Sequence, residues 1–170
     1  GPGRHRRVSP EGRAEGGAVV AGGGVVLGKA STLLTKLARK YQIPVTGTLM
    51  GLGSFPGSDP LWLGMLGMHG TYYANMAISH CDLLLAIGVR FDDRVTGTIE
   101  TFAAKAKIVQ IDVDPSSVNK NVAVDLPIIG DTGAVLQDLI KFMDEHNHTH
   151  EASQRQEWLQ KPAFALRPVR

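Results

Sequence analysis

One short segment, Leu83–Ile87, constrains more than any other what this chain can fold into. All five residues are apolar, and the polar Asp82 and the glycine Gly88 bound the run. The run has the length of a strand, since a membrane-spanning helix needs roughly 20 apolar residues. A strand that is apolar along its whole length is typical of a parallel sheet that is covered on both faces. The segment therefore predicts a buried parallel strand.

Strand and helix patterns alternate along the rest of the chain. Apolar runs predict further strands at residues 18–21, 43–46, 107–113, 122–124 and 127–129. Apolar residues at the helical period predict helices near residues 33–41, 71–80 and 131–143. This alternation predicts a doubly wound α/β fold (Rossmann-like), in which a parallel sheet of about six strands carries helices on both faces. Residues 51–70 contain six glycines and two prolines and are expected to form a long loop or tight turns.

The two ends of the chain differ in composition from its middle. Residues 1–17 are rich in glycine and arginine and show no usable period, so we expect an irregular leader there. Residues 146–170 are polar and are expected to form a tail or an interdomain linker. A single nucleotide-binding domain is expected to cover residues 18–145, a size typical of one domain.

Charge and cysteine content exclude several classes of protein. The chain has 18 basic and 16 acidic residues, of which seven basic and one acidic residue lie in residues 1–13 and 161–170; the body therefore carries 11 − 15 = −4. A nucleic-acid partner is not expected, because such proteins carry a basic face on the folded part. The one cysteine, Cys81, fits a reducing compartment. We expect a cytoplasmic protein without a membrane partner, because no secretory signal or membrane-spanning run is visible.

A glycine triplet follows the first predicted strand, at the strand end where a doubly wound sheet binds its ligands. Gly22, Gly23 and Gly24 would let a phosphate approach backbone N–H groups at the start of a helix. An ordinary NAD site is not expected, because Leu27 stands where the dinucleotide fingerprint needs its third glycine and the second strand ends without an acidic residue. The alternative is a tight strand-to-helix turn, and the triplet favours neither.

Residues 66–71 (Leu-Gly-Met-His-Gly-Thr) connect the glycine-rich segment to a predicted helix. Thr71 could cap that helix while His69 faces a cleft, although a single histidine is more often structural. The sequence places no second histidine, cysteine or carboxylate beside His69 at the spacing of metal ligands, so no metal site is predicted.

Charged residues follow two of the predicted strands. The segment Arg90-Phe91-Asp92-Asp93-Arg94 places four charges at a strand end, where they cost solvation energy unless they pair or meet a ligand. An arginine there can bind phosphate or carboxylate with bidentate geometry. The alternative is a salt-bridge cluster that only ends the strand, but the position favours a ligand.

Two aspartates lie further along the same predicted edge. Asp112 ends a strand where an acidic residue of a doubly wound fold binds ribose hydroxyls, whereas Asp114 belongs to an Asp-Pro turn. Asp131 is expected to be the N-cap of the last helix. The sequence has no G-x-S-x-G, Walker A or C-x-x-C motif, so it offers a nucleotide cradle without a nucleophile, and no catalytic residue is predicted.

Four motifs at these strand ends resemble the central domain of the acetohydroxyacid synthase (acetolactate synthase) large subunit. The motifs are Thr48-Leu49-Met50-Gly51, residues 63–71, residues 88–97 and residues 111–115. The match covers about residues 18–141, and residues 64–97 carry most of it.

The resemblance implies a thiamine-diphosphate- and Mg²⁺-dependent transferase. The whole enzyme decarboxylates pyruvate and adds the two-carbon unit to a second 2-oxo acid, which gives acetolactate or acetohydroxybutyrate in branched-chain amino-acid synthesis. It also implies that the central domain binds FAD in an extended pose for a structural purpose, while thiamine diphosphate and Mg²⁺ bind other domains. The implied partners are the rest of the large subunit, a homodimer partner and a possible regulatory subunit.

The resemblance also assigns residues. It implies that FAD lies along residues 69–90 and 112–131, with Asp112 at the adenosine ribose and Arg90 at the pyrophosphate or its surroundings. It implies a substrate channel, where inhibitors also bind, near Met68, His69, Asp93 and Arg94. The residues expected to contact FAD are Gly22, Gly23, Gly24, Thr48, Leu49, Met50, Leu66, Gly67, Met68, His69, Gly88, Val89, Arg90, Asp112, Val113 and Asp131.

The sequence departs from the family in three ways. It shows no domain with the activating glutamate, no Gly-Asp-Gly metal-diphosphate motif, and no apolar helix in residues 1–17. We therefore expect a central domain that is inactive by itself. The alternatives are a relative without flavin, the central domain of another carboligase such as glyoxylate carboligase, and a non-catalytic flavin- or nucleotide-binding assembly module. The segment Arg90–Arg94 favours the biosynthetic synthase.

Overall fold

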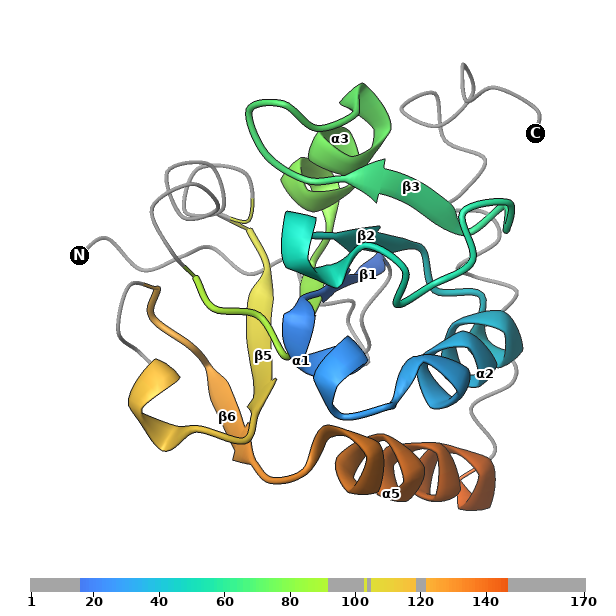
Figure 1. The fold of residues 1–170 in the computed structure, drawn as a ribbon, viewed down its shortest axis with the longest axis vertical. Helices are drawn as coiled ribbons and strands as arrows, with labels where there is room; N and C mark the ends of the chain where they lie inside the picture. The colour runs from blue at the N-terminus through green and yellow to red at the C-terminus, as the bar shows by residue number, and fades with distance from the viewer. Residues whose placement is uncertain (1–15, 92–102, 104, 119–121, 147–170) are drawn as a thin grey trace.

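A computed structural model describes residues 16–91, 103, 105–118 and 122–146 (Figure 1). In these residues six strands form one sheet with all neighbours parallel, in the order β3-β2-β1-β4-β5-β6. The strands are β1 (Gly17–Ala21), β2 (Val45–Gly47), β3 (Trp62–Met65), β4 (Leu83–Ile87), β5 (Lys107–Asp112) and β6 (Leu126–Ile129). The helices and 3₁₀ turns are α1 (Gly23–Leu27), α2 (Ser31–Tyr41), η1 (Leu49–Gly51), α3 (Tyr72–His80), η2 (Pro115–Ser117) and α5 (Thr132–Glu145). The predicted doubly wound α/β fold is confirmed.

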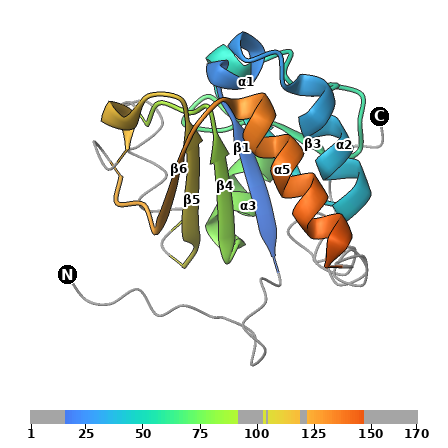
Figure 2. The ribbon, with the colours of Figure 1, turned by 90° about the horizontal axis from the view of Figure 1, so that it is seen from below.

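The strand order reverses between β1 and β4. From β1 the chain moves outward through β2 to β3, returns to place β4 on the other side of β1, and then continues outward to β6. The register pairs Val20 with Ala86 and Ala21 with Ile87, so β1 and β4 end at the same level. In open α/β sheets, ligands bind beyond the carboxyl ends of the strands at such a reversal point. Figure 2 shows α1 at this carboxyl edge.

Helices cover both faces of the sheet, which explains why the central strands are apolar along their length. In Figure 2, α2 and α5 lie on one face and α3 lies on the other. Ala18 and Val20 of β1 pack on the α3 side, whereas Val19 and Ala21 pack on the α2 and α5 side. Both sides of the central strands are therefore removed from water, as the apolar run in β4 predicts.

A polar contact joins α2 to α5 at the ends of the two helices. The Tyr41 hydroxyl donates a hydrogen bond to Oδ1 of Asp144 at 2.5 Å, and Nζ of Lys40 lies 2.6 Å from the same oxygen. These contacts, with Lys40 first, hold the pKa of Asp144 below its ordinary value. Lys40 and Tyr41 end α2, so the contact fixes how that helix lies against α5.

Two strand predictions need correction. Residues 122–124 form no strand; Val122 is buried and Val124 packs beside it in the core on the α3 side, and β6 begins only at Leu126. The segment 51–70 contains β3, which the sequence did not reveal. Gly64 in β3 has a φ of +97°, and the register of β3 with β2 shifts between Val45 and Thr46, so β3 lacks a regular strand pattern.

The described helices are all too short or too polar to cross a lipid bilayer.

The reversal point depends on a close approach between glycines. A Cβ atom at Gly22 would lie 2.3 Å from the carbonyl oxygen of Gly88, and one at Gly24 would lie 2.6 Å from the Cα of Gly88. Gly88 itself has a φ of +61°. The contacted atoms of Gly88 cannot shift easily, because they belong to the backbone next to a paired strand.

We therefore expect Gly22→Ala to lower the free energy of unfolding by about 3 kcal/mol, the upper part of the usual range for overpacking. Urea unfolding followed by circular dichroism would measure the change. Gly17→Ala is the matched control in β1, because a Cβ there meets nothing within 4 Å; we expect a change within about 0.5 kcal/mol. Equal stability of the two variants would contradict the close approach.

Candidate functional site

The turn between β1 and α1 is held to the end of β4 by backbone hydrogen bonds. The N–H of Gly22 donates to the Ile87 carbonyl, and the N–H of Gly24 donates to the Gly88 carbonyl, each at 3.0 Å. Two of the three N–H groups in the triplet are therefore used within the fold. The structure gives Gly22 and Gly24 a packing role, whereas the N–H of Gly23 has no partner in the described part of the chain.

The segment after β2 packs against this turn. The N–H of Thr48 donates to the Ala21 carbonyl at 3.0 Å, and a Cβ at Gly51 would lie 2.1 Å from the same carbonyl oxygen. Leu49 and Met50 in η1 are exposed, with Met50 76% exposed. The Cβ of Met50 lies 3.2 Å from where a Cβ at Gly23 would stand. Gly23 after β1 therefore lies beside the two exposed apolar residues after β2, Leu49 and Met50.

A rigid loop follows β3. Asn75 of α3 holds Gly67 from both sides, because its Oδ1 accepts from the Gly67 N–H and its Nδ2 donates to the Gly67 carbonyl, both at 3.0 Å. Thr71 caps α3 as predicted: its Oγ1 accepts from the Ala74 N–H and also donates to the Leu63 carbonyl at 2.5 Å. The loop presents Met68, which is 83% exposed, and the exposed His69 to solvent.

The segment after β4 alternates between buried and exposed side chains. Val89 and Phe91 are buried in the core on the α3 side, and Arg90 between them is exposed. No described residue forms a hydrogen bond or an ion pair with the Arg90 side chain. Asp92, Asp93 and Arg94 lie outside the described residues.

A buried amide supports this segment from β5. Nε2 of Gln110 donates to the Val89 carbonyl at 3.3 Å. Oε1 of Gln110 is fully buried and has no hydrogen-bond partner in the described part of the chain. Because an unpaired buried polar atom is costly, this amide is a candidate for positioning Val89 and the arginine that follows it.

The end of β5 carries a carboxylate that is nearly buried. Asp112 is 7% exposed, and its Oδ1 accepts from the Asp114 N–H at 2.9 Å. Its Oδ2 has no partner among the residues that the structure describes. Val113 beside it is exposed, and Asp131 caps α5 by accepting from the Ala134 N–H at 3.0 Å. The predicted capping role of Asp131 is therefore confirmed.

Backbone contacts join these strand ends into one continuous edge. The N–H of Gly88 donates to the Ile111 carbonyl, the N–H of Gly130 donates to the Asp112 carbonyl, and the N–H of Leu66 donates to the Gly47 carbonyl. The predicted site residues within the described ranges all lie along this edge. It combines exposed apolar side chains, an unpaired arginine and a carboxylate with an available oxygen, which suits a ligand with ring systems, phosphates and hydroxyls.

The described residues offer little for metal or nucleophile chemistry. They contain no group of three or more His, Cys, Asp or Glu side chains that could hold a metal ion. Burial raises the pKa of the Cys81 thiol to about 12, and the charge of Asp82 adds to the shift. Because the thiolate is the reactive form, Cys81 is inert at neutral pH.

Two residues that position the edge were not predicted. Gln110 could have been noticed as a polar residue in the middle of an apolar strand. Asn75 gives no such signal, because asparagine within a predicted helix is ordinary and its contact with Gly67 exists only in the folded chain.

The sequence is similar to one family model and to several curated proteins. A model described as "Thiamine pyrophosphate enzyme, central domain" matches residues 13–139. The acetolactate synthase large subunit of Cyanidium caldarium is 49% identical over 140 residues, which are 82% of this chain and 24% of that protein. The probable acetolactate synthase large subunit of Methanocaldococcus jannaschii is 50% identical over 143 residues, 84% of this chain and 24% of that protein.

A third similar protein is the acetolactate synthase large subunit of Haemophilus influenzae, 47% identical over 124 residues, 73% of this chain and 22% of that protein. The chain thus spans about a quarter of the length of the curated relatives that it matches.

The contact between Asn75 and Gly67 can be tested directly. We expect Asn75→Ala to lower the free energy of unfolding by about 1–3 kcal/mol, because two backbone groups of a partly buried loop lose their partners. Hydrogen exchange should become faster at the amides of residues 67–70. Asn75→Asp keeps an acceptor for the Gly67 N–H but no donor, so its effect should be intermediate. Unchanged exchange in Asn75→Ala would show that the loop does not depend on this clamp.

Proposed function

The chain belongs to the family of thiamine pyrophosphate enzyme central domains, and on that premise we propose that it is the FAD-binding central domain of an acetolactate synthase large subunit. In the whole enzyme, pyruvate would be decarboxylated and its two-carbon unit joined to a second 2-oxo acid. Thiamine diphosphate and Mg²⁺ would supply that chemistry from other parts of the subunit. This domain would hold FAD, which serves structure in the enzymes that the sequence resembles.

One observation carries the FAD proposal: Arg90, three residues after β4, and Asp112, the last residue of the neighbouring strand β5, both keep polar atoms that no described residue binds. A guanidinium without a partner can donate to pyrophosphate oxygens with bidentate geometry. A carboxylate oxygen at the end of a strand can accept from ribose hydroxyls.

The apolar side chains of the edge support the same proposal. Leu49, Met50, Met68 and Val113 are exposed on the protein alone. A flavin and an adenine ring lying across them would remove apolar surface from water, at roughly 25 cal/mol for each Å² buried. The loop that carries Met68 is already fixed by Asn75, so little of that gain would be lost in ordering the loop.

The remaining parts of the proposal concern surroundings and partners. Met68, His69, Asp93 and Arg94 would line the substrate channel, and the rest of the large subunit, a homodimer partner and a possible regulatory subunit would surround the domain. The single buried thiol of Cys81 supports a reducing, cytoplasmic location.

Two alternative functions are compatible with the same site. The chain would then be the central domain of another carboligase, such as glyoxylate carboligase, or a non-catalytic flavin-binding module. The similarity to acetolactate synthase large subunits favours the synthase over the other carboligase. Flavin binding alone does not separate the synthase from the non-catalytic module, whereas the coding sequence on either side of these residues would.

We expect the purified chain to bind FAD and Arg90→Ala to bind it about tenfold more weakly, because hydrogen bonds to charged groups contribute about 1.5–3 kcal/mol. Titration of the protein into FAD, followed by flavin fluorescence, would measure both affinities. Lys105→Ala is the control, since it removes an exposed cation near the opposite edge of the sheet. Equal affinity of wild type and Arg90→Ala would contradict the role given to Arg90, and no binding by wild type would contradict the FAD proposal.

We also expect no acetolactate when the 170-residue chain is incubated with pyruvate, FAD, thiamine diphosphate and Mg²⁺. The physical reason is that its sequence contains no Gly-Asp-Gly motif to hold the metal diphosphate. A colorimetric assay for acetoin after acid decarboxylation of acetolactate would measure the product. Turnover above a protein-free control would contradict the assignment of catalysis to other domains.

A further inference from the structure

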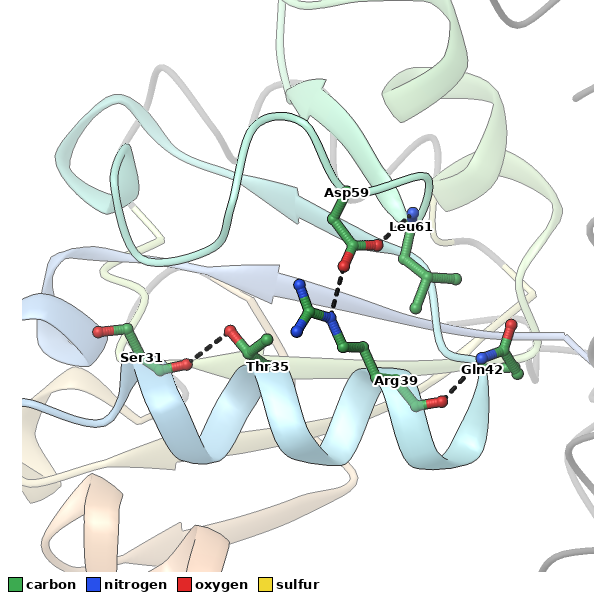
Figure 3. Close-up of polar contacts among 6 residues, drawn as sticks. All are labelled: Ser31, Thr35, Arg39, Gln42, Asp59 and Leu61. Carbon is green, nitrogen blue, oxygen red and sulfur yellow. Dashed lines mark hydrogen bonds and ion pairs between the residues drawn. The ribbon is translucent and has the colours of Figure 1, made fainter. Parts of the chain in front are cut away.

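A hollow lies beside α2. It has a volume of about 670 Å³ and lies between one face of α2, from Ser31 to Arg39, and the segment that follows η1. Figure 3 shows this region, with α2 on one side and the segment leading to β3 arching over it. None of the predicted FAD-binding residues lines the hollow. Its volume is in the range of small-molecule sites.

A buried carboxylate orients an arginine at this hollow. Nε of Arg39 lies 2.7 Å from Oδ2 of Asp59, and the other oxygen of Asp59 accepts from the Leu61 N–H at 2.9 Å. The Asp59 side chain is only 6% exposed, so both of its oxygens are committed within the fold. Asp59 therefore binds the guanidinium of Arg39 through its Nε and not through its two terminal nitrogens.

The rest of the guanidinium remains available. Figure 3 shows the two terminal nitrogens of Arg39 turned away from Asp59, toward the side on which Thr35 lies. Neither nitrogen has a hydrogen-bond partner among the described residues. Arg39 and Thr35 both line the hollow, so a pair of adjacent N–H donors faces it.

The lining has a one-sided charge. Lys36 lies three residues before Arg39 on the same face of α2 and also lines the hollow, whereas no aspartate or glutamate does. Ser31 and Thr32 add hydroxyls that no described residue binds. Ser54 in the opposite wall is fully buried, and no residue that the structure describes forms a hydrogen bond with its hydroxyl. Asp59 compensates the charge of Arg39, so Lys36 leaves this group with a net positive charge on a domain whose body carries a net charge of −4.

We propose that this hollow is a second binding site, which takes a small organic oxyanion: a phosphate monoester or a carboxylate with an apolar body. The planar fork of Arg39 matches two oxygens of either anion, and Lys36 adds a second positive charge. Pro56 in the opposite wall is partly exposed and provides apolar surface for the body of the ligand, whereas Phe55 beside it is 4% exposed and packs into the core. The site does not depend on FAD binding at the carboxyl edge.

The test uses the full chain labelled with ¹⁵N and three probes: inorganic phosphate, phenyl phosphate and benzoate, each titrated at constant ionic strength with chloride. We expect saturable shifts in the amide resonances of residues 31–36 and 53–57, and none in residues 22–24. Phenyl phosphate should bind more tightly than inorganic phosphate because of the apolar wall. The tighter of phenyl phosphate and benzoate identifies which oxyanion the site prefers.

Substitutions of Arg39 and Lys36 test whether these two cations bind the oxyanion. Arg39→Gln should weaken phenyl phosphate or benzoate binding about tenfold or more, the range for hydrogen bonds to charged groups. Arg39→Lys should restore little, because the fork is lost although the charge remains. Lys36→Gln leaves the contact between Arg39 and Asp59 intact and should weaken binding a few-fold. Lys105→Gln, which removes one exposed cation elsewhere, should bind as wild type does.

Two results would overturn the proposal. One is the absence of saturable shifts at residues 31–36 and 53–57 with all three probes. The other is binding that Arg39→Gln and Lys36→Gln weaken no more than Lys105→Gln does. The circular dichroism spectrum and the melting temperature of each variant would establish that it is folded. If Arg39→Gln does not fold, Lys36→Gln still tests the proposal.

Discussion

The close approach of two backbone turns, one after β1 and one after β4, is the constraint on which the rest of this structure depends. The atoms in contact are backbone atoms of Gly22, Gly24 and Gly88, and a single Cβ at either of the first two would collide with the third. This contact fixes β1 beside β4, and thereby fixes the point where the sheet reverses its strand order. It also gives the glycine triplet a packing role, because the N–H groups of Gly22 and Gly24 donate hydrogen bonds within the fold.

Parallel strands then determine where polar chemistry collects. Because all six strands point the same way, segments that are far apart in the sequence end at one edge. Two side chains from inside the fold stabilise that edge, Asn75 through Gly67 and Gln110 through Val89. The exposed side chains of Met68 and Arg90 each follow a residue whose backbone is fixed by one of these two hydrogen-bonded side chains. This arrangement favours binding, since a ligand would not have to order the segments that it contacts.

Much of the fold followed from periodicity, because the apolar face of α2 and the apolar runs of β1, β4 and β5 record burial directly in the sequence. The strand β3 could not be predicted, since Gly64 takes a left-handed conformation within it, and residues 122–124 looked like a strand because their apolar side chains fill the core. Gly22, Arg90 and Asp112 were predictable because each lies at or shortly after the end of a strand that the sequence reveals. The contacts of Asn75, Gln110 and Arg39 were not, because their partners are set by tertiary packing and not by spacing.

The carboxyl edge and the hollow beside α2 share one physical origin. A single segment supplies Leu49 and Met50 to the edge and residues 53–57 to the wall of the hollow. Its position is set at Gly51, which lies so close to the Ala21 carbonyl that no side chain fits there, and by the hydrogen bond from the Ser54 N–H to the Gly51 carbonyl. The end of β1 therefore positions both surfaces. A change at that strand end would alter the hollow as well as the edge, whereas Arg39 and Lys36 line the hollow and not the edge.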